Sequence, residues 1–175
     1  MGIQEVPDSI IKLLSISSPV PIMLPNTLEV LKLYFSGHTK EQINLSCYQN
    51  VVKLHLFHLR MMPNNSVAFP PNLVKTTLVH LMVDSHLLSM IKKLPKLKIL
   101  KMRRCRYDEG KMDLSGDVTG DSFPQLEVLH FVEASWLTEV TCTDDVSMPK
   151  LNKVLLEVFP QSDIRLSERL AKLRM

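Results

Sequence analysis

The stretch Leu94–Met102 reads Leu-Pro-Lys-Leu-Lys-Ile-Leu-Lys-Met and decides the fold of this 175-residue chain. Its core is the phrase Leu-x-x-Leu-x-apolar, with a proline two residues before the first leucine. The phrase recurs, with or without the proline, and its first positions are Leu28, Val51, Leu73, Leu97, Leu126 and Leu151. Successive phrases are separated by 23, 22, 24, 29 and 25 residues. A repeated period of this size indicates an array of stacked units.

A period between 20 and 29 residues with this leucine pattern is typical of leucine-rich repeats. We therefore predict an α/β leucine-rich-repeat solenoid of about six to seven irregular repeats. A curved, parallel sheet forms its concave face, and short helices and irregular loops form its convex face. Side chains alternate along a strand, so the fourth and sixth phrase positions should point into the core. These pairs are Leu31/Leu33, Leu54/Leu56, Thr76/Leu78, Leu100/Met102, Leu129/Phe131 and Val154/Leu156.

The phrases divide the chain into three parts. Residues 1–25 are predicted to be an N-terminal cap or a degraded first repeat, because an open solenoid end would expose its core to water. Residues 26–157 hold the repeats. Residues 158–175 should form a C-terminal cap, in which Leu166, Leu170 and Leu173 lie at helical spacing.

Two segments between strands carry helix signals. Thr39 and Gln42 fit a capping box that opens a helix over Glu41–Tyr48. Asp84-Ser85 is expected to cap a helix over His86–Lys93. The long fourth step contains residues 108–121, which include five acidic residues and three of the five glycines. We interpret them as an exposed, mobile insertion that folds near the basic strand before it and partly neutralises it.

Composition narrows the class of protein. A net charge of +3 does not demand a nucleic-acid or membrane partner. The three cysteines lie far apart and form no Cys-x-x-Cys pair, which favours free thiols in a reducing compartment. No secretory signal and no apolar run long enough to span a membrane is present in the sequence. These observations predict a soluble, cytoplasmic protein.

The concave face is the predicted binding surface, because side chains at the third, fifth and seventh phrase positions point out of the core. Its candidate protein-binding residues are Lys32, Tyr34, Lys53, His55, Phe57, Lys75, Thr77, Lys101, Arg103, His130 and Lys153. This basic, partly aromatic set indicates an acidic patch on a protein partner, with Tyr34 and Phe57 as anchors. Any single lysine there also serves solubility.

Signals for other chemistry are weak. His55 and His58 resemble half a metal site, but residues three apart on a strand face opposite sides. No nucleophile elbow, phosphate-binding loop or carboxylate pair occurs in the sequence, so we predict neither an enzyme nor a bound cofactor. Residues 92–106 hold eight basic residues and no acidic residue. Nucleic acid is not the favoured partner, because a strand places these charges on alternating faces. The lone Trp136 is expected to pack on the convex side.

Several phrases together resemble one protein family. Phe69-Pro-Pro-Asn-Leu, Ile91–Met102, Ser122–Phe131 and Met148-Pro-Lys-Leu follow one another with the acidic, glycine-rich stretch between them. In this order they resemble the C-terminal half of the leucine-rich-repeat domain of plant intracellular nucleotide-binding, leucine-rich-repeat disease-resistance proteins. The likeness is greatest to the late-blight-resistance type with an N-terminal coiled coil.

The resemblance implies a role in innate immunity. In that family the repeats sense a pathogen effector or a guarded host protein, and they hold a nucleotide-binding switch inactive until defence signalling and local cell death are released. ADP or ATP would bind only to a nucleotide-binding domain that is absent from this chain. The alternatives are a substrate adaptor of a ubiquitin ligase, a truncated decoy or modulator, and a structural remnant without a partner.

Overall fold

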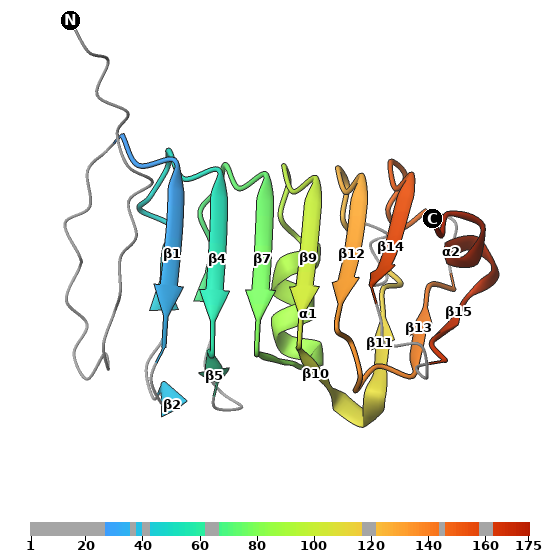
Figure 1. The fold of residues 1–175 in the computed structure, drawn as a ribbon. Helices are drawn as coiled ribbons and strands as arrows, with labels where there is room; N and C mark the ends of the chain where they lie inside the picture. The colour runs from blue at the N-terminus through green and yellow to red at the C-terminus, as the bar shows by residue number, and fades with distance from the viewer. Residues whose placement is uncertain are drawn as a thin grey trace, which may run out of the picture.

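The computed structural model of the chain describes residues 27–35, 38–39, 43–61, 67–116, 122–143, 146–157 and 163–175. The predicted N-terminal cap, residues 1–25, lies outside this part. Six parallel strands form the main sheet, side by side in chain order (Figure 1). They are β1 (Val30–Tyr34), β4 (Lys53–Phe57), β7 (Lys75–Val79), β9 (Ile99–Arg103), β12 (Val128–Val132) and β14 (Lys153–Glu157).

The register confirms the predicted phrases. Every strand pairs with its neighbour at the same phrase position, so that Leu31 lies opposite Leu54 and Leu129 lies opposite Val154. The six strands begin with the same spacings as the six phrases. The fold is therefore a parallel solenoid with little helix, as the repeat pattern predicts.

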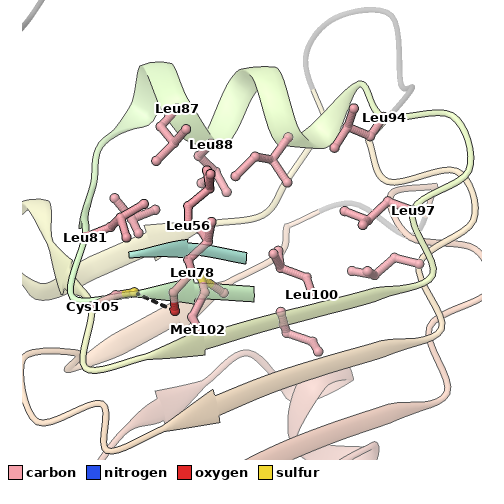
Figure 2. Packing of buried hydrophobic residues seen from close by; sticks show 14 of the residues in the cluster. Leu56, Leu78, Leu81, Leu87, Leu88, Leu94, Leu97, Leu100, Met102 and Cys105 are labelled. Atoms are coloured by element: carbon pink, nitrogen blue, oxygen red, sulfur yellow. Dashed lines mark hydrogen bonds between the residues drawn. The ribbon is translucent and has the colours of Figure 1, made fainter. Parts of the chain in front are cut away.

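The inward columns form one continuous core. All twelve predicted inward residues except Leu156 are buried, and Leu156 is partly buried and packs against the same cluster. Figure 2 shows part of this core, where Leu56, Leu78 and Met102 from neighbouring strands meet side chains from the convex side. Because each column runs through all six strands, no repeat buries its own leucines alone.

Cys105 belongs to this core. Its Sγ donates a weak hydrogen bond to the carbonyl oxygen of Leu78 at 3.5 Å (Figure 2). Burial raises the pKa of its thiol to about 11, so the side chain stays neutral. Cys47, Cys105 and Cys142 all have free thiols, in agreement with the spacing argument.

One helix covers the convex side of the third and fourth strands. Helix α1 (Ser85–Lys92) begins after Asp84, whose Oδ1 accepts a hydrogen bond from the backbone N–H of Leu87 at 2.7 Å. Its buried face consists of Leu87, Leu88 and Ile91. The predicted helix is thus confirmed, together with its aspartate cap.

Short parallel strand pairs form in the other segments that connect one main strand to the next on the convex side. Three of them join neighbouring repeats: β2 (His38–Thr39) with β5 (Arg60–Met61), β3 (Ile43–Asn44) with β6 (Val67–Ala68), and β8 (Met82–Val83) with β10 (Arg106–Tyr107). A three-stranded sheet follows, formed by β11 (Lys111–Asp113), β13 (Glu139–Thr141) and β15 (Arg165–Leu166).

The predicted helix over Glu41–Tyr48 is wrong. Ile43 and Asn44 form strand β3, and the backbone N–H of Leu45 donates to the carbonyl oxygen of Ala68 at 2.7 Å. The Asn44 side chain then accepts the N–H of Ser46 at 3.0 Å. Such a side-chain hydrogen bond satisfies a backbone N–H without a helix. The pairing of β3 with β6 of the next repeat satisfies the neighbouring backbone groups.

The acidic stretch is also structured where it is described. Asp108–Gly110 form a short 3₁₀ turn, β11 follows, and the side chains of Met112 and Leu114 are buried. Residues 108–116 are therefore part of the convex layer and not the exposed, mobile insertion that we predicted. The alternation of Met112 and Leu114 with polar neighbours indicates a strand. Our prediction of a loop relied on the acidic composition instead and overlooked this alternation. Residues 117–121 lie outside the described part.

The chain ends against the last strand. Helix α2 (Glu168–Lys172) buries Leu170 completely, whereas Leu166 lies in β15 and not in a helix. Val154 donates its N–H to the carbonyl oxygen of Leu173 at 2.9 Å, and Met175 donates to the carbonyl oxygen of Val154 at 3.1 Å. Leu170 and Leu173 thus lie at the predicted end of the array; the boundary at residue 158 stays a prediction.

Thr76 interrupts the leucine columns, and its replacement by valine should stabilise the protein. The side chain is fully buried, and its Oγ1 has no hydrogen-bond partner among the described residues. Valine has the same shape without the hydroxyl, so Thr76→Val is expected to raise the free energy of unfolding by about 1 kcal/mol. Urea denaturation measures this change.

Thr138→Val is the matched control for that substitution. The Thr138 hydroxyl donates to the carbonyl oxygen of Gly110 at 3.0 Å, so valine there should destabilise the protein. A loss of stability in both variants would contradict the account of Thr76.

Candidate protein-binding surface

The concave face is the surface of the six-stranded sheet that faces away from the core. The structure places all eleven predicted contact residues on this sheet, at its third, fifth and seventh phrase positions. In the fifth position the neighbours run Lys32, His55, Thr77, Lys101, His130 and Leu155 across the strands. Thr77 is only 7% exposed, so it forms the floor of the face and offers little surface to a partner.

Two aromatic rings lie at the end of the face that β1 and β4 form. Tyr34 and Phe57 occupy the seventh position in neighbouring strands and stack with centroids 4.2 Å apart and planes 7° apart. The ring of His55 lies 6.4 Å from Phe57 in a near-parallel orientation. Stacked aromatic rings that keep part of their surface exposed are suitable anchors for an apolar or aromatic side chain.

Lysines surround the floor residue Thr77. Lys53 and Lys75 are register neighbours at the third position, and Lys32 and Lys101 lie at the fifth position of β1 and β9. Neighbouring strands are about 4.8 Å apart, so Lys53 and Lys75 carry like charges side by side. None of the four lysines forms an ion pair with a described residue. This concentration of positive charge favours an anionic partner.

In the second half of the face, on β9, β12 and β14, carboxylates of the chain itself bind the basic side chains. The Arg103 side chain donates to Oε1 of Glu133 at 2.7 Å, and Arg104 binds the other oxygen of the same carboxylate. These hydrogen bonds hold the pKa of the Glu133 carboxyl below its usual range. His130 pairs with Glu157 at 2.7 Å.

Our expectation that the acidic stretch 108–121 partly neutralises the basic residues before it is met, among the described residues, at Lys92. Its Nζ donates to the carbonyl oxygen of Ser115 at 2.6 Å, and its charge favours the ionised form of Asp113. The ion-pair partners of Lys98, Arg103 and Arg104 come from the following repeat instead: Glu127 pairs with Lys98, and Glu133 pairs with the two arginines. The reason is geometric, since equal phrase positions lie one strand spacing apart in a parallel stack whereas β11 belongs to the convex layer.

His130 lies on this face with only 13% of its side chain exposed. Burial and the positive charge of Lys101 lower the pKa of His130, and the hydrogen bond with Glu157 partly opposes them. At pH 7 the imidazole is therefore neutral. It contributes a hydrogen-bonding side chain to the face and no additional positive charge.

A rim of polar side chains borders the face where the strands end. The sequence analysis did not predict this rim. The eighth phrase positions His58, His80, Arg104 and Glu133 all have positive φ, between 51° and 57°. His58 and His80 stack with centroids 4.8 Å apart and planes 5° apart. His58 therefore belongs to this rim, whereas His55 lies on the strand face, and the two do not form a shared metal site. The sequence signal that could have predicted the rim is a polar residue at the eighth phrase position of four successive repeats.

The rim makes stability depend on pH. Burial, followed by the charges of His58, Arg104 and Arg103, lowers the pKa of His80 from 6.5, while Glu133 opposes them. As the pH falls through 6.5, the unfolded chain takes up a proton more readily than the folded chain. Stability should therefore decrease from pH 7 to pH 5, and His80→Gln should reduce that decrease. Thermal unfolding at low salt measures it; equal slopes in both proteins would contradict the assignment.

Two other surface features lie outside the concave face. Trp136 is 58% exposed, with the Arg106 guanidinium 5.2 Å from its ring centroid, so our prediction that it packs on the convex side is wrong. A cavity of about 360 Å³ lies beside α1, β11 and β13, with the acids Asp84, Asp113 and Glu139 among two lysines. Its mixed charges define no ligand.

Two known plant proteins are similar to almost the whole of this chain. The chain is 56% identical over 173 residues to the ToMV resistance protein Tm-2(2) of tomato (Solanum lycopersicum) and 57% identical to the ToMV susceptible protein tm-2 of the same plant. Both alignments cover 99% of this chain and 20% of the relative. The chain is similar to one fifth of a plant virus-resistance protein.

The Tm-2 relatives include both a resistance protein and a susceptible one at nearly equal identity. No protein-family model and no solved structure matches the chain. The longer α-helix in the described part, α1, has eight residues, so no helix there could cross a membrane.

Proposed function

We propose that this chain is a non-catalytic protein-recognition segment of a plant intracellular immune receptor. The observation that carries the proposal is the concave face: six in-register strands present an aromatic pair and four lysines without an ion-pair partner among the described residues. The Tm-2 relatives supply the setting, because their names refer to resistance and susceptibility to a plant virus.

The partner is a protein. In the receptor type that the sequence resembles, it would be a pathogen effector, a guarded host protein, or the nucleotide-binding domain of the same receptor. The chain spans about 20% of its Tm-2 relatives, so nucleotide exchange and signalling would belong to other parts of a whole receptor. We place the segment in the cytoplasm, where those partners occur.

The first test is capture of partners by the tagged 175-residue chain from plant extract at low and high salt. Recovery at low salt of a nucleotide-binding receptor domain, an effector or a host target supports recognition, and loss at high salt supports contact through charge. Recovery of a ubiquitin-ligase scaffold would favour the adaptor alternative. Recovery of no protein at either salt concentration would contradict the proposal.

A further inference from the structure

We infer that the docking site is the first half of the concave face, on β1, β4 and β7, together with Lys101 of the adjoining strand β9. It binds an extended acidic protein segment with an aromatic or large apolar residue at one end. The inference deepens the proposed function and rests on it. It follows from how charge, ion pairs and aromatic rings are distributed along the sheet.

The charge distribution separates the two halves. Among the described residues from 27 to 83, Glu29 is the one carboxylate, and it forms no ion pair with a described residue. The five Lys/Arg ion pairs in the described part of the chain, and the hydrogen bond between the neutral His130 and Glu157, all involve residues after position 97. An acidic partner can therefore find unpaired lysines in the first half, whereas in the second half it would have to displace Glu133 or Glu157.

The aromatic pair fixes one end of the site. Tyr34 lies two residues beyond Lys32 on the same strand and face, and Phe57 lies in the same relation to His55. A side chain that packs on this pair would thus be adjacent to the lysine cluster. The second half offers no stacked aromatic pair on its face among the described residues; it presents Val128 and Leu155, and Val132 is buried.

The size of the patch sets the length of the segment. Lys32 and Lys101 are three strand spacings apart, or about 14 Å. An extended chain crosses that distance in about four to five residues. Lys53 and Lys75 flank this path from the third position. The complementary segment therefore has an anchor residue followed by a short run of aspartates or glutamates.

The test uses a fluorescein-labelled peptide in which a tryptophan precedes alternating glutamates and aspartates, with fluorescence anisotropy as the measurement. The wild-type 175-residue chain should bind it at low salt. Lys53→Glu/Lys75→Glu should weaken binding by more than about tenfold. Lys150→Glu/Lys172→Glu, an equal change of charge at exposed positions beside the β14 end of the sheet and outside its strands, should weaken it by less than about twofold.

Companion peptides separate charge from anchoring. A peptide with glutamines and asparagines in place of the acids should not bind, and a peptide with alanine in place of tryptophan should bind more weakly. Equal losses in the two double variants would overturn the inference. A wild-type chain that captures a protein partner but does not bind the acidic peptide would overturn it as well, and the proposed recognition function would stand.

Discussion

Leu100→Ala is expected to lower the free energy of unfolding by about 3–5 kcal/mol. Leu100 has no exposed surface and occupies the fourth phrase position of β9, between Thr76 and Leu129 in the register. Figure 2 shows it within the leucine core. Removing its branched side chain leaves a cavity that both neighbouring repeats line, and a close-packed interior cannot collapse fully into it.

Urea denaturation followed by circular dichroism measures this loss. Leu155→Ala is the matched control, because Leu155 lies at the fifth phrase position of β14 on the concave face and is only partly buried. It should cost less than about 1 kcal/mol. Equal losses at the two positions would contradict the assignment of inward and outward positions, on which the binding surface also depends.

Charge reversal of Lys53, Lys75 and Lys101 together is expected to weaken binding of the captured protein partner by about 10- to 100-fold at low salt. Each substitution removes an attractive charge and introduces a repulsive one toward an acidic partner. Because the contacts are near the surface, the difference from wild type should shrink as salt screens them. Binding measured at several salt concentrations tests both the size and the salt dependence.

The control for this prediction carries the same change of charge away from the concave strands. Lys93, Lys96 and Lys150 are exposed and lie outside the six strands, so their reversal to glutamate should leave affinity close to wild type. An unchanged melting temperature shows that both variants remain folded. Equal weakening by the two triple variants would indicate attraction to net charge and contradict docking on the concave face.

The main sheet could be predicted from sequence because it depends on a pattern of short range. Leu97, Leu100 and Met102 recur at fixed spacing, and one periodicity fixes strand, inward face and register together. Helix α1 was equally local, since Asp84 caps an uninterrupted apolar face.

The convex layer could not be predicted in the same way. Ile43–Asn44 becomes a strand because Val67–Ala68 of the next repeat pairs with it, and no local signal reports that partner. Lys111–Asp113 pairs with Glu139–Thr141 across a long step, and its local signal was limited to the alternation of Met112 and Leu114 with polar residues. Short strands of two or three residues carry little propensity of their own, so their tertiary partners decide their structure.

The candidate site could be predicted from the sequence only in part. Period-two alternation placed Lys53, Lys75 and Tyr34 on one face, but it could not show that Glu133 binds two arginines or that Tyr34 stacks on Phe57. Those contacts depend on side-chain directions at neighbouring strands. The division of the face into an unpaired half and a neutralised half therefore needed the structure.

The strict order of the six strands has a consequence for how such a surface can change over generations. Within the part of the chain that the structure describes, each strand of this sheet pairs with its immediate neighbours in the sequence of repeats (Figure 1). A repeat gained or lost between β4 and β9 by unequal recombination would move the aromatic pair relative to Lys101 by about 4.8 Å and leave the other strand pairs intact. The length of the partner segment that fits the site would thus change in steps of one strand spacing, and the side chains at either end of the site would stay the same.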